Sequence, residues 1–285
     1  MKLLFINQKM LIMKTLENQT LLYDEDCPLC QAYTTGFVKT GMLDKNGKKA
    51  FSNLTNEEHN FIDLKRASNE IALVDNKNKT VIYGIDSLLK VIGNSFPWME
   101  KVGNIAPVKY LLKKLYSFIS YNRKVIIPNK KANDTVLQCV PTFSYKYRII
   151  YIIFSLLITA LTLYNYSKLM PALPIANFSR ELAIASGQII FQSLFLLKFE
   201  NKLLLNYIGN LMTVSLAGAI LLTPVLILNQ FVNIPETITL AWFALTVLFL
   251  FMEHFRRIKI LELPTFLSYT WIIYRVIVLL VILNF

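Results

Sequence analysis

The chain has 285 residues, of which 54% are hydrophobic and 17% are charged, and its formal net charge is +12. Soluble domains have about 45–50% apolar and about 25% charged residues, so this composition excludes a wholly soluble enzyme and a disordered chain. Residues 1–148 carry 22 Lys or Arg and 13 Asp or Glu, whereas residues 149–285 carry eight and five. We therefore predict a basic soluble domain followed by a membrane domain. Three cysteines are too few for a disulfide scaffold.

The N-terminal region lacks the pattern of a secretory signal peptide. Lysines occur at positions 2, 9 and 14, and the apolar runs between them are shorter than the roughly 7–15 residues of an h-region. Residues 19–23 have the composition of a short strand, which ends at the acidic turn 24–26. Cys27-Pro28-Leu29-Cys30 follows, and we expect a helix from there to about Leu43.

The next segments complete a compact α/β unit. Residues 49–53 are a second candidate strand, and Thr55-Asn56-Glu57-Glu58 has the pattern of a capping box at a helix start. Residues 70–75 and 80–83 flank a polar turn and indicate a hairpin, and a helix is expected over residues 84–92. The order β-α-β-α-β-β-α predicts a thioredoxin-like, or glutaredoxin-like, domain with its redox pair in a C-x-x-C at a strand-to-helix junction.

The two cysteines of this motif have the placement that thiol-disulfide exchange needs. The attacking species is a thiolate, and the positive end of the helix dipole lowers the pKa of a cysteine at a helix N-terminus. We therefore expect Cys27 to be the nucleophile and Cys30 to be the resolving thiol, with Pro28 at the first helical position. The acidic residues 24–26 act in the opposite direction on the pKa of Cys27, and the sequence leaves the net sign open.

The segment Leu22-Tyr23-Asp24-Glu25-Asp26-Cys27-Pro28-Leu29-Cys30 resembles the signature of the DCC family of thiol-disulfide oxidoreductases, named for an Asp followed by two cysteines. Tyr83-Gly84-Ile85-Asp86-Ser87-Leu88 and residues 115–124 resemble that family's tyrosine–glycine segment and closing helix. The resemblance covers roughly residues 20–127 and extends to members with appended membrane helices. It implies a thioredoxin-like fold and a redox-active pair. The residues with motif-supporting roles are then Asp24, Asp26, Pro28, Tyr83 and Gly84.

The chain departs from the family pattern at two places. Glu25 stands where the family usually has a glycine, a residue that favours unusual backbone conformations or close approach. Residues 67–70, before the third strand, lack the proline that thioredoxin-fold enzymes hold in the cis form beside the active cysteine. Both departures argue against efficient disulfide exchange with protein substrates.

Two other interpretations of the cysteine pair stay open. In one, the pair is inert. In the other, it belongs to a zinc site, which needs four ligands. Cys27, Cys30, Cys139 and His59 are the candidates, although the chain has no second C-x-x-C. Cys139 alone is expected to be an inert boundary cysteine rather than a third exchange partner.

Residues 101–133 carry eight Lys or Arg and no acidic residue, and a helix is expected over residues 107–122. Its basic face is either solvated or in contact with anionic lipid of the inner leaflet, at about 1 kcal/mol per basic residue. Nucleic-acid binding is poorly motivated in a membrane-tethered protein. We divide the chain into a thioredoxin-like domain (18–128), a basic linker (129–148) and a membrane domain (149–285).

Five apolar segments follow, and a helix needs about 20 apolar residues, with a range of about 17–25, to cross a bilayer. The expected helices cover residues 149–166, 182–197, 203–228, 237–252 and 266–285. Because the second and fourth are short, four spans is the alternative. Basic residues cluster in the second and fourth loops, and the positive-inside rule then places the N-terminal domain in the cytoplasm and the C-terminus outside.

Polar residues within these segments are candidates for an intramembrane site. Gln188 and Gln192, and likewise Asn206 and Asn210, are spaced i,i+4, so each pair shares a helix face. Interhelical hydrogen bonding or a polar pocket accounts for such pairs.

Arg275 is ten residues into the last segment, where an unpaired cation costs at least about 2.5–3.5 kcal/mol. We expect it to face the bundle interior and to pair with Glu253, which precedes His254 near the inner end of the fourth segment. The alternative is a site for a lipid, quinone or substrate headgroup. Residues 149–285 contain no cysteine, so this half cannot pass electrons across the bilayer by thiol exchange.

The sequence thus predicts a multi-pass protein of the bacterial inner membrane that acts as a thiol-disulfide oxidoreductase without a cofactor. The expected partners are anionic lipid and either a thiol or disulfide protein or a partner membrane subunit, and not nucleic acid. The alternative function is a non-catalytic membrane scaffold or assembly subunit whose thioredoxin-like domain is a binding module.

Overall fold

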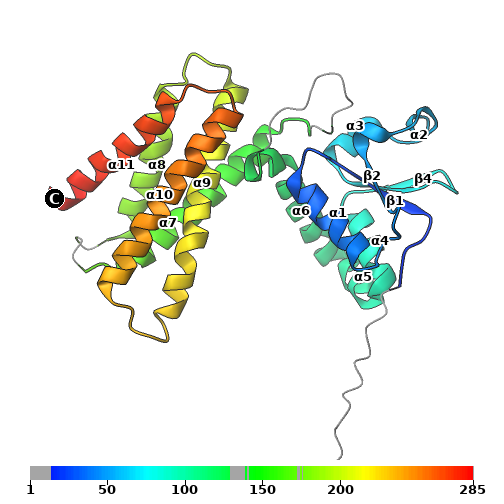
Figure 1. The fold of residues 1–285 in the computed structure, drawn as a ribbon, viewed down its shortest axis with the longest axis horizontal. Helices are drawn as coiled ribbons and strands as arrows, with labels where there is room; N and C mark the ends of the chain where they lie inside the picture. The colour runs from blue at the N-terminus through cyan, green and yellow to red at the C-terminus, as the bar shows by residue number, and fades with distance from the viewer. Residues whose placement is uncertain (1–13, 129–138, 140, 172–173, 175, 285) are drawn as a thin grey trace, which may run out of the picture. The chain divides into compact units, whose positions relative to one another are not determined.

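The computed structural model describes residues 14–128, 139, 141–171, 174 and 176–284, and the chain divides into two compact units (Figure 1). An α/β unit comprises Met1–Arg123 and Lys131–Thr142, and a helical unit comprises Lys124–Lys130 and Phe143–Phe285. Residues 1–13 of the expected N-terminal region, and residues 129–138 and 140 of the expected linker, lie outside the described residues.

The α/β unit is built on a four-stranded sheet of order β2-β1-β3-β4. β1 pairs in parallel with β2 and antiparallel with β3, which pairs antiparallel with β4. The strands are β1 (Gln19–Tyr23), β2 (Lys48–Ala50), β3 (Ala72–Asp75) and β4 (Thr80–Tyr83). The helices are α1 (Pro28–Lys39), the 3-10 turn η1 (Phe51–Asn53), α2 (Asn56–His59), α3 (Leu64–Asn69), α4 (Ile85–Ser95), α5 (Pro97–Gly103) and α6 (Ala106–Ile126). The predicted α/β class is confirmed, and the unit is consistent with a thioredoxin-like fold.

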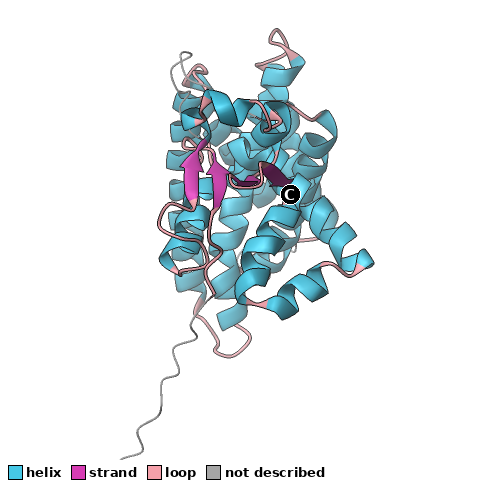
Figure 2. Ribbon diagram, turned by 90° about the vertical axis from the view of Figure 1, so that its right-hand side faces the viewer, coloured by secondary structure: helices cyan, strands magenta, loops and turns pink. Residues whose placement is uncertain are grey.

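Neighbouring side chains along a strand point to opposite faces of the sheet, and in this sheet both faces are buried under helices or loops. Leu21 and Leu73 pack on one face with residues of α1, α4 and α6. Leu22, Ala72 and Val74 pack on the other face with residues of η1, α3 and the loop between α2 and α3. Figure 2 colours the strands magenta and the helices cyan.

Local signals set several boundaries of these elements. α1 ends at Lys39, earlier than expected, because Gly41 follows with a φ of +77° that leaves the helical conformation. The second strand is shorter than expected and passes into η1. The expected second helix forms as two, since Thr55 and Glu58 make the predicted capping box and Asp63 then caps a separate helix, α3.

The helical unit contains α7 (Tyr145–Ser167), α8 (Phe178–Leu194), α9 (Asn201–Leu228), α10 (Glu236–Ile260) and α11 (Phe266–Asn284). By length and composition, α7, α9, α10 and α11 are able to cross a membrane, whereas α8 has 17 residues. The all-helical class predicted for this half is confirmed. The number of spans stays a prediction.

Contacts between the helices show that they alternate in direction. The Tyr166 hydroxyl, at the end of α7, donates to the carbonyl of Thr239 near the start of α10 (2.8 Å). Gln192, near the end of α8, accepts from the Tyr207 hydroxyl near the start of α9 (2.9 Å) and donates to the carbonyl of Leu267 at the start of α11 (3.3 Å). α8 therefore traverses the bundle beside the longer helices (Figure 1).

A candidate redox site at the start of α1

The cysteine pair lies where the chain leaves β1 and enters α1. Asp24 Oδ1 accepts a hydrogen bond from the N–H of Asp26 (3.0 Å), and the Asp24 carbonyl accepts one from the N–H of Cys27 (3.1 Å). Cys27 is the N-cap of α1 and Pro28 is its first residue, a position that needs no N–H. Cys30 follows in the first turn of the helix and is buried.

The surroundings of the two thiols separate their pKa values. Hydrogen bonding to Cys30 lowers the pKa of Cys27 to about 6, although burial and the Asp24 carboxylate act to raise it. The pKa of Cys30 is raised above its ordinary value, because its hydrogen bond with Cys27 and its burial favour the protonated thiol. At neutral pH the site therefore holds a thiolate at Cys27 next to a thiol at Cys30.

A buried guanidinium compensates the charge of Asp24. Nη2 of Arg123, in the last turn of α6, lies 3.5 Å from Asp24 Oδ2, and the two side chains are 6% and 3% exposed. The positive charge of Arg123 also acts to lower the pKa of both cysteines. The charge of Asp24 is thus compensated within the fold, which the sequence alone did not reveal.

Arg123 also draws together the segments around the site. Its Nη2 donates to the carbonyls of Ser68 (3.0 Å) and Cys139 (2.8 Å), and its Nη1 donates to Ser120 Oγ (3.3 Å). The Cys139 sulfur lies 3.4 Å from Nη2 and 3.7 Å from the carbonyls of Ala67 and Ser68. Cys139 therefore belongs to this site, beside the segment where thioredoxin-fold enzymes carry their cis-proline.

Our interpretation of the sequence missed Arg123, because it lies in a basic stretch that we expected to face solvent or lipid. One signal was present: Tyr116, Ser120 and Arg123 are spaced i, i+4 and i+7, and so share a helix face. In the structure the Tyr116 hydroxyl accepts from the N–H of Ile71 (2.7 Å), and Ser120 donates to the Asn69 carbonyl (2.6 Å). This face of α6 is the polar back wall of the site.

The site contains a cavity of about 240 Å³, whose wall includes Cys30, Tyr33, Tyr116, Arg123 and Cys139. Burial raises the pKa of Tyr33, and it raises the pKa of Tyr116 to about 12, so both phenols stay protonated. A thiolate, an adjacent thiol and a cation that favours thiolate are the groups that disulfide exchange requires.

Tyr83 and Gly84 support the hairpin. The Tyr83 hydroxyl accepts from the N–H of Asp63 (2.9 Å), and the Arg66 guanidinium lies 4.4 Å from the centre of its ring. Gly84 has a φ of +66°, and a Cβ there would lie 2.9 Å from Glu70 Oε2. Among the described residues these contacts hold the hairpin against α3 and Glu70, and none of them involves a cysteine.

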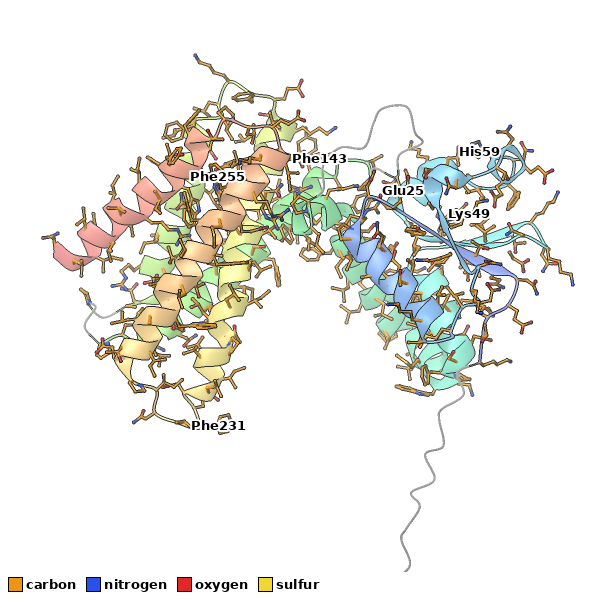
Figure 3. All side chains as sticks on the ribbon, in the orientation of Figure 1. Glu25, Lys49, His59, Phe143, Phe231 and Phe255 are labelled. Carbon is orange, nitrogen blue, oxygen red and sulfur yellow. The ribbon has the colours of Figure 1, made fainter. Side chains whose placement is uncertain are left out.

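The structure describes the backbone at both places where the chain departs from the family pattern. Glu25 is exposed (Figure 3), and it is not among the described residues with positive φ, so the backbone there does not require glycine. No cis peptide bond occurs in the described part of the chain. For the zinc alternative, His59 is exposed on α2, and the described residues bring together no metal-binding group of three His, Cys, Asp or Glu side chains.

Residues 21–127 match the DCC1-like thiol-disulfide oxidoreductases. The matched segment runs from β1 through α6 and contains both cysteines, Tyr83, Gly84 and Arg123. The resemblance to this family that the sequence predicted over roughly residues 20–127 is thereby confirmed, and four helices able to cross a membrane follow the matched segment. The comparisons with curated proteins and with solved structures found no match.

In the helical unit, two of the intramembrane candidates join a buried network. Tyr207, the donor to Gln192, has its hydroxyl 3.3 Å from His254 Nε2. His254 Nδ1 lies 3.1 Å from Ser268 Oγ. This network ties together α8, α9, α10 and α11, which is a structural role.

The asparagine pair lies on α9. Asn210 donates to the carbonyl of Asn206 (3.0 Å), and its Oδ1 accepts from Arg257 Nη1 (2.9 Å). Arg257 also donates to the carbonyls of Val125 (2.6 Å) and Ile126 (3.0 Å). These contacts fix the end of α10 against the last residues of α6 within the helical unit.

The expected pairing of Glu253 with Arg275 is wrong. Glu253 accepts from Arg256 and Arg257, each at 2.7 Å, because residues three and four positions apart on one helix are neighbours. Arg275 instead lies over the ring of Trp271, 4.4 Å from its centre, and makes no ion pair with any described residue.

Proposed function

We propose that this protein is a membrane-tethered thiol-disulfide oxidoreductase that uses the Cys27–Cys30 pair on the cytoplasmic side. The Cys27 thiolate attacks one sulfur of a substrate disulfide, which forms a mixed disulfide and releases the other substrate sulfur as a thiolate. Cys30 then loses its proton and attacks the Cys27 sulfur, so that the second substrate thiol leaves. The substrate gains two electrons, and a separate dithiol reduces the Cys27–Cys30 disulfide again.

The observation that carries this proposal is the separation of the two thiol pKa values at a helix N-terminus. Cys27 has a pKa of about 6, so it is the nucleophile at neutral pH, whereas the pKa of Cys30 is raised and keeps it protonated. A resolving thiol must stay unreactive until the mixed disulfide forms beside it. Arg123 supports the thiolate from within the fold, and the match to DCC1-like oxidoreductases gives the general reaction.

A single-turnover assay with 5,5′-dithiobis(2-nitrobenzoate) tests the proposal on the full chain in the Cys139→Ser background. The reduced protein with both site cysteines should release two equivalents of thionitrobenzoate and retain none, because Cys30 displaces the second. Cys30→Ser should release one equivalent and retain the other at Cys27. Cys27→Ser is the matched control and should react at least tenfold more slowly at pH 7, because Cys30 is protonated. Equal reactivity of the two single variants would contradict the assigned roles.

We further propose that the DCC1-like domain faces the cytoplasm of a bacterium and that Phe285 lies outside its inner membrane. The alternating helix directions put the α8–α9 and α10–α11 loops at one end of the bundle. Lys198 lies in the first of these loops, and Lys202 and Lys259 lie in the helix ends beside the two loops. Basic loops stay on the cytoplasmic side. Alkaline phosphatase fused after Phe285 should be active, and a fluorescent protein at the same site should be dark. The reverse result would refute the orientation.

A non-catalytic scaffold is the second candidate, and one observation favours it: Cys27 is 1% exposed and Cys30 is 7% exposed. A protein disulfide cannot reach such sulfurs without local opening. In this alternative, the full chain would co-purify with a stable membrane subunit, and Cys27→Ser would leave the amount of co-purified subunit unchanged. Loss of the partner on Cys27→Ser would favour the oxidoreductase.

A further inference from the structure

The helical unit contains a cavity of about 350 Å³ lined by all five of its helices, α7 to α11. Its charged and amide side chains are Arg180, Glu181, Gln188 and Arg275, five hydroxyl side chains also line it, and the rest of its wall is apolar. The Tyr274 hydroxyl donates to the carbonyl of Ile184 (2.7 Å), which holds α11 against α8 beside the cavity. A volume of this size falls in the range of small-molecule sites, and an apolar wall with a few polar groups is typical of them.

Gln188 is the first sign of a ligand. Its side chain lines the cavity and the residue is only 5% exposed, yet neither Oε1 nor Nε2 has a hydrogen-bond partner among the described residues. Gln192, one turn further along α8, has its amide satisfied by Tyr207 and Leu267. Buried amides are nearly always hydrogen-bonded. The contrast between two glutamines on one face of one helix indicates that the Gln188 amide hydrogen-bonds to a group that is not part of this chain.

Arg275 is the second sign. It is the middle residue of α11, and its Nε is buried without a hydrogen-bond partner in the described part of the chain. Arg180 and Glu181 pair with each other at 2.8 Å, so their charges cancel. Arg275 is then the uncompensated charge of the described cavity wall, which has a net charge of +1.

We propose that this cavity binds one amphipathic anion, a carboxylate or phosphate headgroup on an acyl chain, with the headgroup at Arg275 and Gln188. A guanidinium pairs with planar carboxylates and with phosphates through charge-assisted hydrogen bonds. A neutral headgroup such as a quinone would satisfy Gln188 and leave the charge of Arg275 uncompensated in a low-dielectric site. The acyl chain lies along Ile272, Val276 and Leu279, which line the same cavity on α11.

The site is in the half of the bundle away from the basic loops, since it includes Tyr166 and Arg180 at the α7–α8 end. With the topology proposed above, the ligand therefore belongs to the outer half of the bilayer. Its binding does not depend on the cysteine pair, so it is to be tested independently of the redox activity.

The experiment uses the full chain purified in an uncharged detergent and radiolabelled laurate as the probe. Unlabelled laurate and dilauroyl phosphatidic acid should displace the probe, and the tighter of the two identifies the source as a free fatty acid or a lipid phosphate. Methyl laurate and decylubiquinone, which carry no charge, should compete at least about tenfold more weakly. If either neutral compound competes as well as both anions do, the proposal is wrong.

Variants locate the site. Arg275→Gln should weaken laurate binding at least about tenfold, because a charge-assisted hydrogen bond is lost, and Gln188→Leu should weaken it a few-fold. Lys259→Gln is the matched control, since Lys259 is an exposed cation of the same unit outside the cavity. Arg275→Lys, which keeps the charge, should retain most binding, and Arg275→Met replaces Arg275→Gln if that variant does not fold. Unchanged laurate binding in Gln188→Leu and in a folded, uncharged variant at position 275 would overturn the proposal.

Discussion

Arg123 and Arg275 are inward-facing guanidinium groups, one in each unit, but their surroundings differ. Arg123 has a carboxylate at 3.5 Å and donates to the carbonyls of Ser68 and Cys139. Arg275 lies over the Trp271 ring and has no ion pair among the described residues. Burying a cation is expensive unless its charge is matched. The chain itself matches the charge of Arg123, whereas that of Arg275 is left for a ligand.

This difference separates a positioning residue from a binding residue. Arg123 holds the turn before Cys27, the end of α3 and Cys139 in one arrangement, so its loss should affect stability first. Arg275 holds little of its own chain, so its loss should affect ligand binding first. The same residue type thus has opposite consequences in the two units.

The largest effect is expected for Arg123→Met. It leaves Asp24 buried without a counter-charge, so the free energy of unfolding of the α/β unit should fall by about 3–5 kcal/mol. Pulse proteolysis of the full chain in urea measures this change. The double variant Asp24→Asn/Arg123→Met should recover part of the loss, and a double variant no more stable than Arg123→Met would show that the ion pair is not the cause.

Arg275→Leu should change the stability of the helical unit by no more than about 1 kcal/mol in delipidated protein, since losing the cation–π contact is offset by removing an unmatched charge. The same proteolysis assay provides the value. A loss as large as that of Arg123→Met would mean that Arg275 is also structural.

The reactivity of Cys27 should follow its pKa of about 6. Because the thiolate fraction rises from about one tenth at pH 5 to about nine tenths at pH 7, alkylation by iodoacetamide should accelerate about tenfold over this range. The lowered pKa also contributes folding stability that is fully present above the ordinary thiol pKa and is lost as the pH falls through about 6. Cys27→Ser should abolish this profile, and a midpoint near pH 9 would contradict the assigned thiolate.

Asp24→Asn should move the alkylation midpoint of Cys27 to lower pH, because the Asp24 carboxylate acts to raise that pKa. This shift should be smaller than the whole lowering of the Cys27 pKa, since the charge of Arg123 already offsets the carboxylate. Glu25→Gln is the control: Glu25 is exposed, where solvent screens its charge. A shift to higher pH in Asp24→Asn would reverse the sign of this interaction.

The smallest effect is expected for Arg275→Leu on the cysteines. Residues 149–285 contain no cysteine, and the Trp271 ring that Arg275 contacts lies within the helical unit. The alkylation rate of Cys27 should therefore stay within about twofold of the unaltered protein. A larger change, measured in the same detergent, would reveal coupling between ligand binding and the redox site.

Local patterns were sufficient to predict several features. The proline after Cys27 and the strand before it indicated a helix that begins at the pair, and the structure has α1 beginning at Pro28. Thr55 and Glu58 indicated a capping box, which is present. These predictions succeed because caps and helix starts depend on residues within one turn of each other.

Composition and local pattern were enough to predict the division into an α/β domain and apolar helices, and the C-x-x-C at a helix start. Which charged groups pair with one another depends instead on how the folded segments pack. Arg123 pairs with Asp24 although it lies on a helix far along the chain. Glu253 pairs with its helical neighbours Arg256 and Arg257 rather than with Arg275. Gln188 and Gln192 lie one turn apart on one face of α8, but of these two amides only that of Gln192 has hydrogen-bond partners among the described residues. The physical reason is that charge pairing and desolvation depend on distances between segments, which no local pattern encodes.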